Sequence, residues 1–345
     1  MTLFTELTTD VGRARELNED SARIVPLGPA STLLIVCDGM GGHEGGEVAS
    51  ATAVDAIASS LAVADATAPR EALCAALVDA HNAVRRVAEA RAMPTMGTTA
   101  VVAWVLGSKV WVAWVGDSRF YRLRGRDRVR SEDHTRVARM VEMGILTADQ
   151  ARNHPEAHIL MQAIGGGPGI REAFKPGAWT EPLDIEPGDV LLLCSDGLYD
   201  LIEEHELAEI VSGRDVVAAG HRLVEVADER GGHDNITVIL ATVDSGMIPT
   251  LPPARPALAA HGSASQTFDP EAHAGAEPTW PGMGVEGGNS APFHRGQASP
   301  PAPQASPGAT PAVVTPKLAA AFVVAAFLIG GVVGWLAHAS TVHVH

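Results

Sequence analysis

Cysteine is scarce in this chain, with three residues among 345. Cys37 and Cys194 lie inside apolar runs, and no pair of cysteines has the spacing of a disulfide framework or a zinc knuckle. Both residues are therefore expected to be core residues of a protein that works in a reducing compartment.

Cationic residues are also few, since 25 Lys and Arg stand against 41 Asp and Glu, for a formal net charge of −16. Nucleic-acid binding needs a positive face that displaces counterions from phosphates, so this balance excludes a general nucleic-acid binder. A surplus of carboxylates suits cation binding better. The N-terminus lacks an apolar stretch and does not resemble a secretory signal, so we expect the body of the chain to stay in the cytoplasm.

Residues 1–244 have the pattern of one compact domain, and 46% apolar residues in the chain supply enough material for a substantial core. Apolar residues spaced by three and four predict two long helices, around 54–61 and 73–87. Strands outnumber helices and are joined by short turns, which favours antiparallel sheets covered by helices over a doubly wound parallel sheet. The predicted strands are 32–37, 98–106, 109–115, 120–124, 190–194 and 236–243.

The rest of the chain predicts a tether and a membrane anchor. Residues 245–317 are rich in Pro, Ala, Gly and Ser without any period, which is typical of a disordered linker. Residues 318–337 read LAAAFVVAAFLIGGVVGWLA without a charge, long enough to cross a hydrocarbon core of about 30 Å as a transmembrane helix. Lys317 flanks the linker side, and residues 338–345 form a short extracytoplasmic tail without Lys or Arg. This bias predicts a single-pass protein of the cell inner membrane with residues 1–244 in the cytoplasm.

An Asp next to Gly or Asn ends or begins an apolar run four times, at Asp38, Asp117, Asp196 and Asp234. If these strand ends lie together, the carboxylates form a cluster of like charges that cations must neutralise. Oxygen ligands without patterned Cys or His suit hard ions such as Mg²⁺ or Mn²⁺ rather than zinc. The alternative meaning of Asp-Gly, a hairpin turn, needs a strand on both sides, whereas Asp38 and Asp196 each precede a helical pattern.

Seven motifs, in order along residues 8–243, resemble those of the bacterial metal-dependent (type 2C) serine/threonine protein phosphatases. The resemblance implies an α+β fold, a four-layer α-β-β-α sandwich of two antiparallel sheets flanked by helices, with a binuclear metal site at one end of the sheets. The motifs are DVGRARELNEDS from Asp10, VCDGMGGHEGGEVAS from Val36, MGTTAVV from Met96, WVGDSRFYRLR from Trp114, EDHT from Glu132, LCSDGLYDLI from Leu193 and GGHDNITVIL from Gly231.

The resemblance also implies a binuclear site of Mn²⁺ or Mg²⁺ ions. Asp38 would bridge the two ions, with the Gly39 carbonyl on one of them and Asp196 and Asp234 on the other. Two further acids, Glu19 and Asp20, would hold metal-bound waters.

Three more positions follow from the same resemblance. Asp117, with Asp196 and more weakly Asp200, would form a third metal site. Arg15 would grip the substrate phosphate, since a planar guanidinium fits two phosphate oxygens. Met40, which bacterial relatives share, stands where eukaryotic members of the family have a histidine that is a candidate general acid, so the proton donor to the leaving group stays unassigned.

The implied activity is hydrolysis of phosphoserine and phosphothreonine in proteins by a metal-bridged hydroxide, and the expected partner is a membrane serine/threonine kinase. Residues 136–165 resemble a flap beside the site that shapes substrate choice. Three alternatives stay open at this point: an inactive phosphatase-like module that binds phosphoproteins, a metallohydrolase of small phosphoesters, and a regulator of anti-sigma-type partners.

Overall fold

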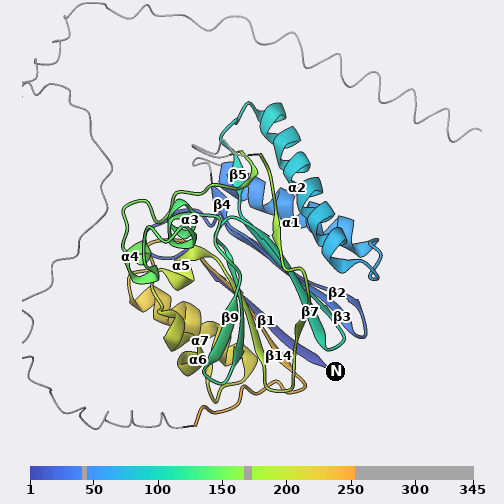
Figure 1. The fold of residues 1–345 in the computed structure, drawn as a ribbon, viewed down its shortest axis with the longest axis vertical. Coiled ribbons are helices and arrows are strands. Elements are labelled where there is room, and N and C mark those ends of the chain that lie inside the picture. The colour runs from blue at the N-terminus through green and yellow to red at the C-terminus, as the bar shows by residue number, and fades with distance from the viewer. Residues whose placement is uncertain (41–44, 167–172, 253–345) are drawn as a thin grey trace, which may run out of the picture. The chain divides into compact units, whose positions relative to one another are not determined.

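A computed structural model describes residues 1–40, 45–166 and 173–252, which form two antiparallel sheets packed face to face (Figure 1). The first sheet has the order β1 (Leu3–Asp10), β14 (Ile236–Val243), β13 (Val190–Cys194), β8 (Arg119–Arg124), β9 (Asp127–Arg130). The second has the order β11 (Gly177–Ala178), β7 (Lys109–Val115), β6 (Ala100–Leu106), β3 (Ser31–Cys37), β2 (Ser21–Gly28), with β12 (Leu183–Asp184) also paired to β7.

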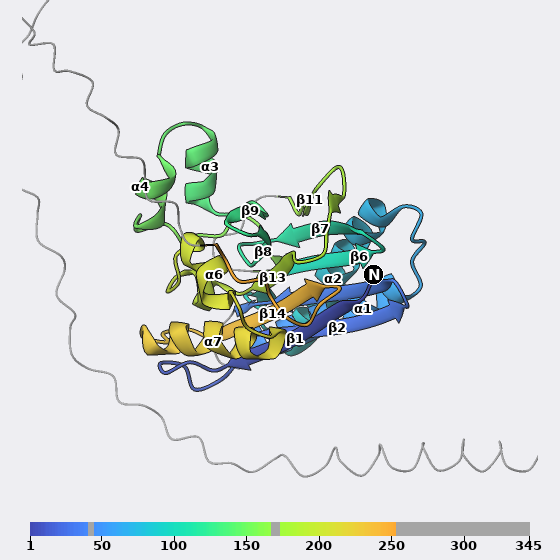
Figure 2. The same cartoon turned by 90° about the horizontal axis from the view of Figure 1, so that it is seen from below.

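Helices cover the outer faces of both sheets. The long helices α1 (Gly45–Ala62) and α2 (Pro69–Arg91) pack on the second sheet. Three others, α5 (Asp196–Tyr199), α6 (Glu204–Val211) and α7 (Val216–Glu229), pack on the first. Two short helices, α3 (Arg136–Glu142) and α4 (Ala148–Arg152), project beside the sandwich on the side away from α1 and α2 (Figure 2). The described residues therefore confirm the predicted α+β fold of antiparallel sheets and helices.

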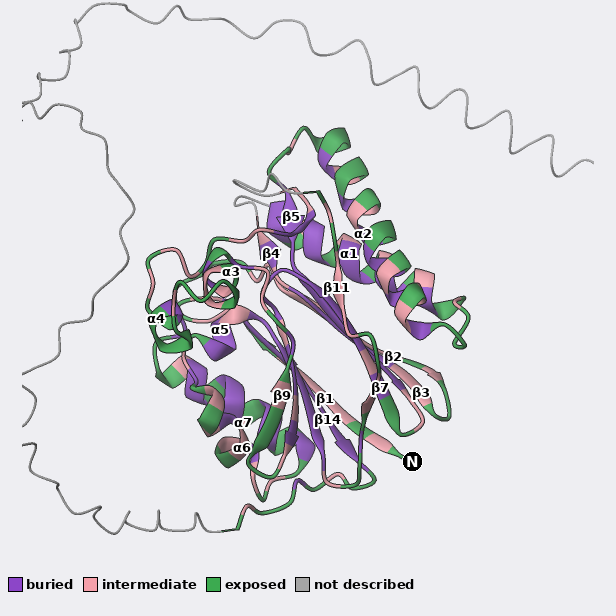
Figure 3. Ribbon diagram, in the orientation of Figure 1, coloured by how far each residue is buried: buried purple, intermediate pink, exposed green. Residues whose placement is uncertain are grey.

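The central strands are apolar on both faces because each lies between a helical layer and the other sheet. In β3, Leu33 and Ile35 pack with α1 and α2, while Leu34 and Val36 face the other sheet. The buried residues lie on the strands between the two helical layers and on parts of the helices that cover them, such as α1 and α7 (Figure 3). Uninterrupted apolar runs of this kind made the inner strands easy to predict. The edge strands β1 and β2 were missed, because they are only partly buried and mix apolar with polar residues.

A small third sheet joins segments that are distant in the sequence. Its order is β10 (Ile164–Gly165), β5 (Gly97–Thr98), β4 (Gly39–Met40). The predicted strand 98–106 is thus divided between β5 and β6. Through β5, the residues that directly follow Asp38 are linked to the end of segment 136–165.

Within the described residues, none of the helices combines the length and apolar character that a membrane crossing requires. The predicted transmembrane helix at 318–337 and the tail at 338–345 lie outside the described residues, as does the predicted linker from residue 253 onward. The first residues of that segment, 245–252, lie against the domain, where Ile248 is buried and Met247 forms a β-bridge with Asp215.

Candidate metal centre

The four strand ends that carry aspartates meet at one end of the sandwich. Asp38 follows β3, Asp117 follows β7, Asp196 begins α5 directly after β13, and Asp234 precedes β14. Asp38 is close enough to Asp196 for the two carboxyl groups to share a hydrogen bond. The electric fields of Asp196, Asp20, Asp117 and Asp234 all act on Asp38. The predicted convergence of these residues is therefore present in the structure.

The pKa values of the clustered carboxyl groups are raised, which indicates that nearby positive charge would stabilise their ionised forms. Burial, reinforced by the neighbouring carboxylates, raises the pKa of Asp38 and of Asp117 well above the ordinary range. The same two causes raise the pKa of Asp20 to about 7 and that of Asp196 to about 6. Divalent cations remove this penalty by neutralising the carboxylates, so the acid cluster fits metal ions with oxygen ligands.

Asp20 supplies a second sign that the site fits a metal ion and its waters. Its Oδ2 accepts a hydrogen bond from Ser195 Oγ at 2.8 Å, and Thr237 also donates to this carboxylate. Its Oδ1 is buried and has no hydrogen-bond partner among the described residues. A buried carboxylate oxygen without a donor is rare in proteins and favours a ligand or an ordered water at that position.

Glycine at position 39 lets three chain segments approach closely. A Cβ added to Gly39 would lie 2.3 Å from the Gly46 carbonyl oxygen and 2.4 Å from that of Glu19. The Gly39 amide donates to the Glu19 carbonyl at 3.2 Å, and the Gly46 amide, in the first turn of α1, donates to the Glu19 carboxylate. The backbone of Gly39 therefore lies between Glu19 and the start of α1, next to the acid cluster.

Two threonines of the MGTTAVV motif fix the backbone of Asp38. The Asp38 carbonyl accepts from Thr98 Oγ1 at 2.7 Å and from the Thr99 amide at 2.8 Å, while its own amide donates to Thr99 Oγ1 at 3.1 Å. Thr99 Oγ1 is also 2.6 Å from the hydroxyl of Ser118, the residue after Asp117. These contacts hold two of the acid-bearing segments in a fixed relation.

Arg15 lies at the rim of the cluster. Its Nη2 donates to Asp234 Oδ2 at 2.7 Å, and about half of the Arg15 side chain is exposed. Glu19 is also near Arg15, since the charge of Glu19 acts on the guanidinium. Burial raises the pKa of the Glu19 carboxyl group. The guanidinium has five N–H donors, more than Asp234 uses, so others can reach a ligand from the solvent side.

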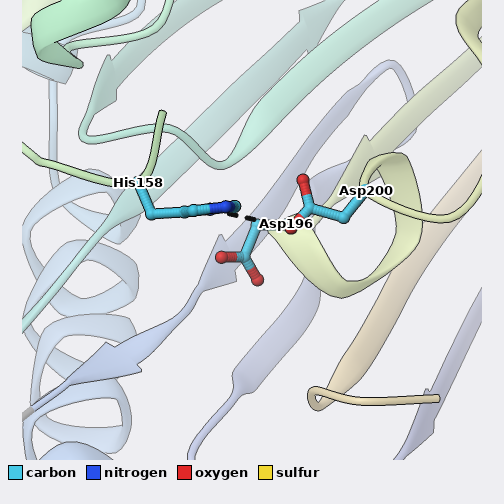
Figure 4. Close-up of side chains that lie close together, drawn as sticks. All are labelled: His158, Asp196 and Asp200. Carbon is cyan, nitrogen blue, oxygen red and sulfur yellow. Dashed lines mark ion pairs between the residues drawn. The ribbon is translucent and has the colours of Figure 1, made fainter. Parts of the chain in front are cut away.

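A histidine that sequence reasoning did not single out completes a further cluster. One ligand atom each from His158, Asp196 and Asp200 lie within 4.8 Å of one another, and His158 Nδ1 is 3.7 Å from Asp200 Oδ2 (Figure 4). His158 belongs to segment 136–165, while Asp196 is the first residue of α5 and Asp200 directly follows that helix. The charge of Asp196 also acts on Asp117, although Asp117 does not belong to this three-residue group. No regular spacing connects His158 with the aspartates, so the sequence offered no signal for it.

Arg119 is a second residue that sequence reasoning missed. Its side chain is 14% exposed and donates to both carboxylate oxygens of Asp133, at 2.9 and 2.6 Å. Its guanidinium carbon lies 3.5 Å from the centre of the Tyr199 ring, and Glu204 is 3.6 Å away. Arg119 thus joins the strand after Asp117 to the helix that carries Asp196.

A two-sheet sandwich with a carboxylate cluster at one end is the architecture of a protein that can hold divalent metal ions. The family model "Protein phosphatase 2C" matches residues 12–241. A serine/threonine phosphatase named stp from Listeria monocytogenes is 34% identical over 249 residues, which cover 70% of this chain and 96% of that protein.

Solved structures agree with this match. The serine/threonine phosphatase PstP/Ppp of Mycobacterium tuberculosis superposes with a TM-score of 0.64 at 31% identity, covering 71% of this chain and all of that one. The catalytic domain of a PstP in complex with two manganese ions gives a TM-score of 0.60 at 30% identity, covering 71% and 98%. The chain therefore belongs to the protein phosphatase 2C family and is a metal-dependent serine/threonine protein phosphatase.

Proposed function

We propose that Asp38, the Gly39 carbonyl, Asp196 and Asp234 hold two divalent ions, Mn²⁺ or Mg²⁺, at the end of the sandwich. Two further acids, Glu19 and Asp20, would hold waters of the ions. The observation that carries this assignment is the convergence of these strand-end aspartates, where partial burial and mutual repulsion raise the pKa of Asp38, Asp196 and Asp20. The unpartnered Oδ1 of Asp20 supports the role of water ligand.

A weaker third ion would be held by Asp117, Asp196 and Asp200. His158 would add a nitrogen ligand to this site, since its ring lies within reach of Asp196 and Asp200.

Bound divalent ions would lower the pKa of coordinated water and offset negative charge on the phosphoryl oxygens. Arg15 binds the phosphate of the substrate with N–H donors that Asp234 leaves available, and Asp234 orients the guanidinium. Met40 has no proton to give, so it does not protonate the leaving serine or threonine oxygen. Cys37 and Cys194 are fully buried, and burial raises the pKa of both thiols, so neither acts as a nucleophile.

The purified chain should hydrolyse a phosphothreonine peptide only with Mn²⁺ or Mg²⁺ present. Asp38→Ala should lower kcat by at least about a hundredfold while the protein stays folded by circular dichroism. The matched control is Asp55→Ala on the exposed side of α1, where an ion pair with Arg23 lies at the surface and activity should not change. Full activity of the wild-type chain in excess chelator would refute the metal assignment.

We also propose that the enzyme is held at the inner membrane by residues 318–337, with its catalytic domain in the cytoplasm, and that it acts on a membrane serine/threonine kinase and the substrates of that kinase. The uncharged apolar run of 20 residues and the absence of Lys and Arg from the tail support this arrangement. Deleting 318–345 should move the enzyme from the membrane to the soluble fraction of a cell lysate. Recovery of both forms in the soluble fraction would contradict the anchor.

A further inference from the structure

The loop that carries Arg15 and Glu19 has no regular secondary structure of its own. Residues 11–20 connect the ends of β1 and β2, and 13–17 are exposed. A loop of this kind would sample many conformations unless other parts of the chain held it. Both residues need defined positions, one for the substrate and the other for the metal centre.

The loop is fastened to the segment just before β14. The Arg13 amide donates to the Gly232 carbonyl at 2.6 Å, and the Arg13 side chain pairs with Asp228. At Gly12, φ is +74° and an added Cβ would lie 2.3 Å from the Asp234 carbonyl oxygen. These contacts hold the first half of the loop. In the second half, the Arg15 side chain pairs with Asp234, and the Glu19 carbonyl accepts from the Gly39 amide at 3.2 Å and from Ser50 Oγ at 2.6 Å.

One buried side chain spans both halves. Asn235 is 5% exposed, and its Nδ2 donates to the carbonyl oxygens of Val11 at 2.9 Å and Leu17 at 3.0 Å. Its Oδ1 accepts from the Glu19 amide at 2.8 Å. Both amide hydrogens and the carbonyl oxygen of one side chain thus bind three backbone positions of the loop, at distances typical of good hydrogen bonds.

We infer that Asn235 is the positioning residue for Arg15 and Glu19, acting through the backbone of the loop on the binding of the substrate phosphate. This inference rests on the proposed role of Arg15. Asn is the residue type that fits, because the site needs two donors and one acceptor in a plane. A carboxylate would face the Val11 and Leu17 carbonyls with acceptors only, and a small apolar side chain would leave buried backbone groups unpaired.

Amide hydrogen exchange of the wild-type chain tests the anchoring without any substitution. The Glu19 amide should exchange at least about a hundredfold more slowly than the amides of Glu16 and Leu17, although all three lie in the same loop without regular structure. Exchange of Glu19 at the rate of its exposed neighbours would overturn the inference.

Kinetics of Asn235 variants, alone and combined with Arg15→Ala, test the functional consequence. Asn235→Ala and Asn235→Asp should each raise the KM for a phosphothreonine peptide and the inhibition constant of inorganic phosphate by about tenfold or more, because the Asp variant loses two buried hydrogen bonds and the Ala variant loses three. Combined with Arg15→Ala, either change should add less than about threefold, because the two residues act through one interaction. Asn82→Asp, at an exposed position of α2, is the control and should leave both constants unchanged.

Three outcomes would overturn the inference. The first is an unchanged inhibition constant of phosphate in both Asn235 variants. The second is a raised inhibition constant in the Asp variant alone, which would reflect only the added charge. The third is a full tenfold rise of the inhibition constant when an Asn235 variant is combined with Arg15→Ala. If Arg15→Ala itself left phosphate inhibition unchanged, the proposed role of Arg15 would fail, whereas the Glu19 exchange rate would still decide whether Asn235 anchors the loop.

Discussion

Replacing Asp20 by Asn should stabilise the metal-free protein at neutral and alkaline pH. The pKa of Asp20 is raised from its ordinary value of 3.8 to about 7, chiefly by burial and then by the charges of Asp196 and Asp234. Such a shift corresponds to about 4 kcal/mol of free energy lost from the folded state once the carboxylate is ionised. An amide has the same shape and no charge. It introduces an N–H group at the position of the unpartnered Oδ1, which costs about 1 to 3 kcal/mol, so a net gain of about 2 kcal/mol is expected at pH 8.

The direction with pH follows from the sign of the shift. A carboxyl group whose pKa is higher in the folded state binds its proton more tightly there. The wild-type protein therefore has its full stability from this group below pH 3.8 and loses it as the pH rises toward 7. The advantage of Asp20→Asn should be about 2 kcal/mol at pH 8 and should disappear or reverse near pH 4.

Urea unfolding in excess chelator, at pH 8 and at pH 4 to 5, measures this difference directly. Saturating Mn²⁺ at pH 8 should reduce or reverse the advantage, because ions neutralise the wild-type cluster and stabilise only the folded state. Asp79→Asn, on the exposed surface of α2, controls for the loss of one negative charge. Equal or lower stability of Asp20→Asn at pH 8 in chelator would refute the electrostatic account of the cluster.

Three further changes test other parts of the site. Gly39→Ala should abolish activity and lower the free energy of unfolding by about 3 kcal/mol or more, measured by thermal unfolding, because the added Cβ would overlap two backbone carbonyls. A stable, active variant would contradict that packing. Arg119→Met should destabilise the domain by about 3 kcal/mol in urea unfolding, because it removes both short hydrogen bonds to the little-exposed Asp133 and leaves that carboxylate only the 3.3 Å contact with Arg130. Arg126→Met, at an exposed ion pair, should lower the free energy of unfolding by less than about 1 kcal/mol, and equal losses in the two variants would count against the role of Arg119. His158→Ala should weaken binding of the third Mn²⁺ in calorimetric titration without changing the melting temperature of the metal-free protein, and an unchanged binding isotherm would remove His158 from that site.

The part of the site that could be predicted from the sequence lies where local pattern and chemistry coincide. Asp38, Asp117, Asp196 and Asp234 each adjoin a strong apolar run, so both the strand and the position of the carboxylate were visible in the sequence. Glu19 and Asp20 lie in and at the end of an exposed loop without periodicity, and only the resemblance to a family pointed to them.

Residues that act through long-range contacts left no such pattern. Asn235 binds Leu17 across 218 positions of the chain, and Arg119 meets the Tyr199 ring through the packing of α5 on the first sheet. His158 reaches Asp200 only because segment 136–165 folds back toward the strand ends. Such contacts are set by tertiary packing, and neither spacing nor residue type along the chain encodes them.

The position of the acid cluster reflects a balance between function and stability. Five aspartates that repel one another would be costly within any of the three apolar clusters of the sandwich, since each of those clusters consists of closely packed side chains. At the strand ends the same residues keep partial access to solvent, and the rigid strands still fix their backbones. Thr98, Thr99 and Asn235 satisfy the backbone groups that strand pairing leaves free at this edge. The fold therefore concentrates the electrostatic cost at one edge, where cations can relieve it, while the three apolar clusters supply the stability that offsets it.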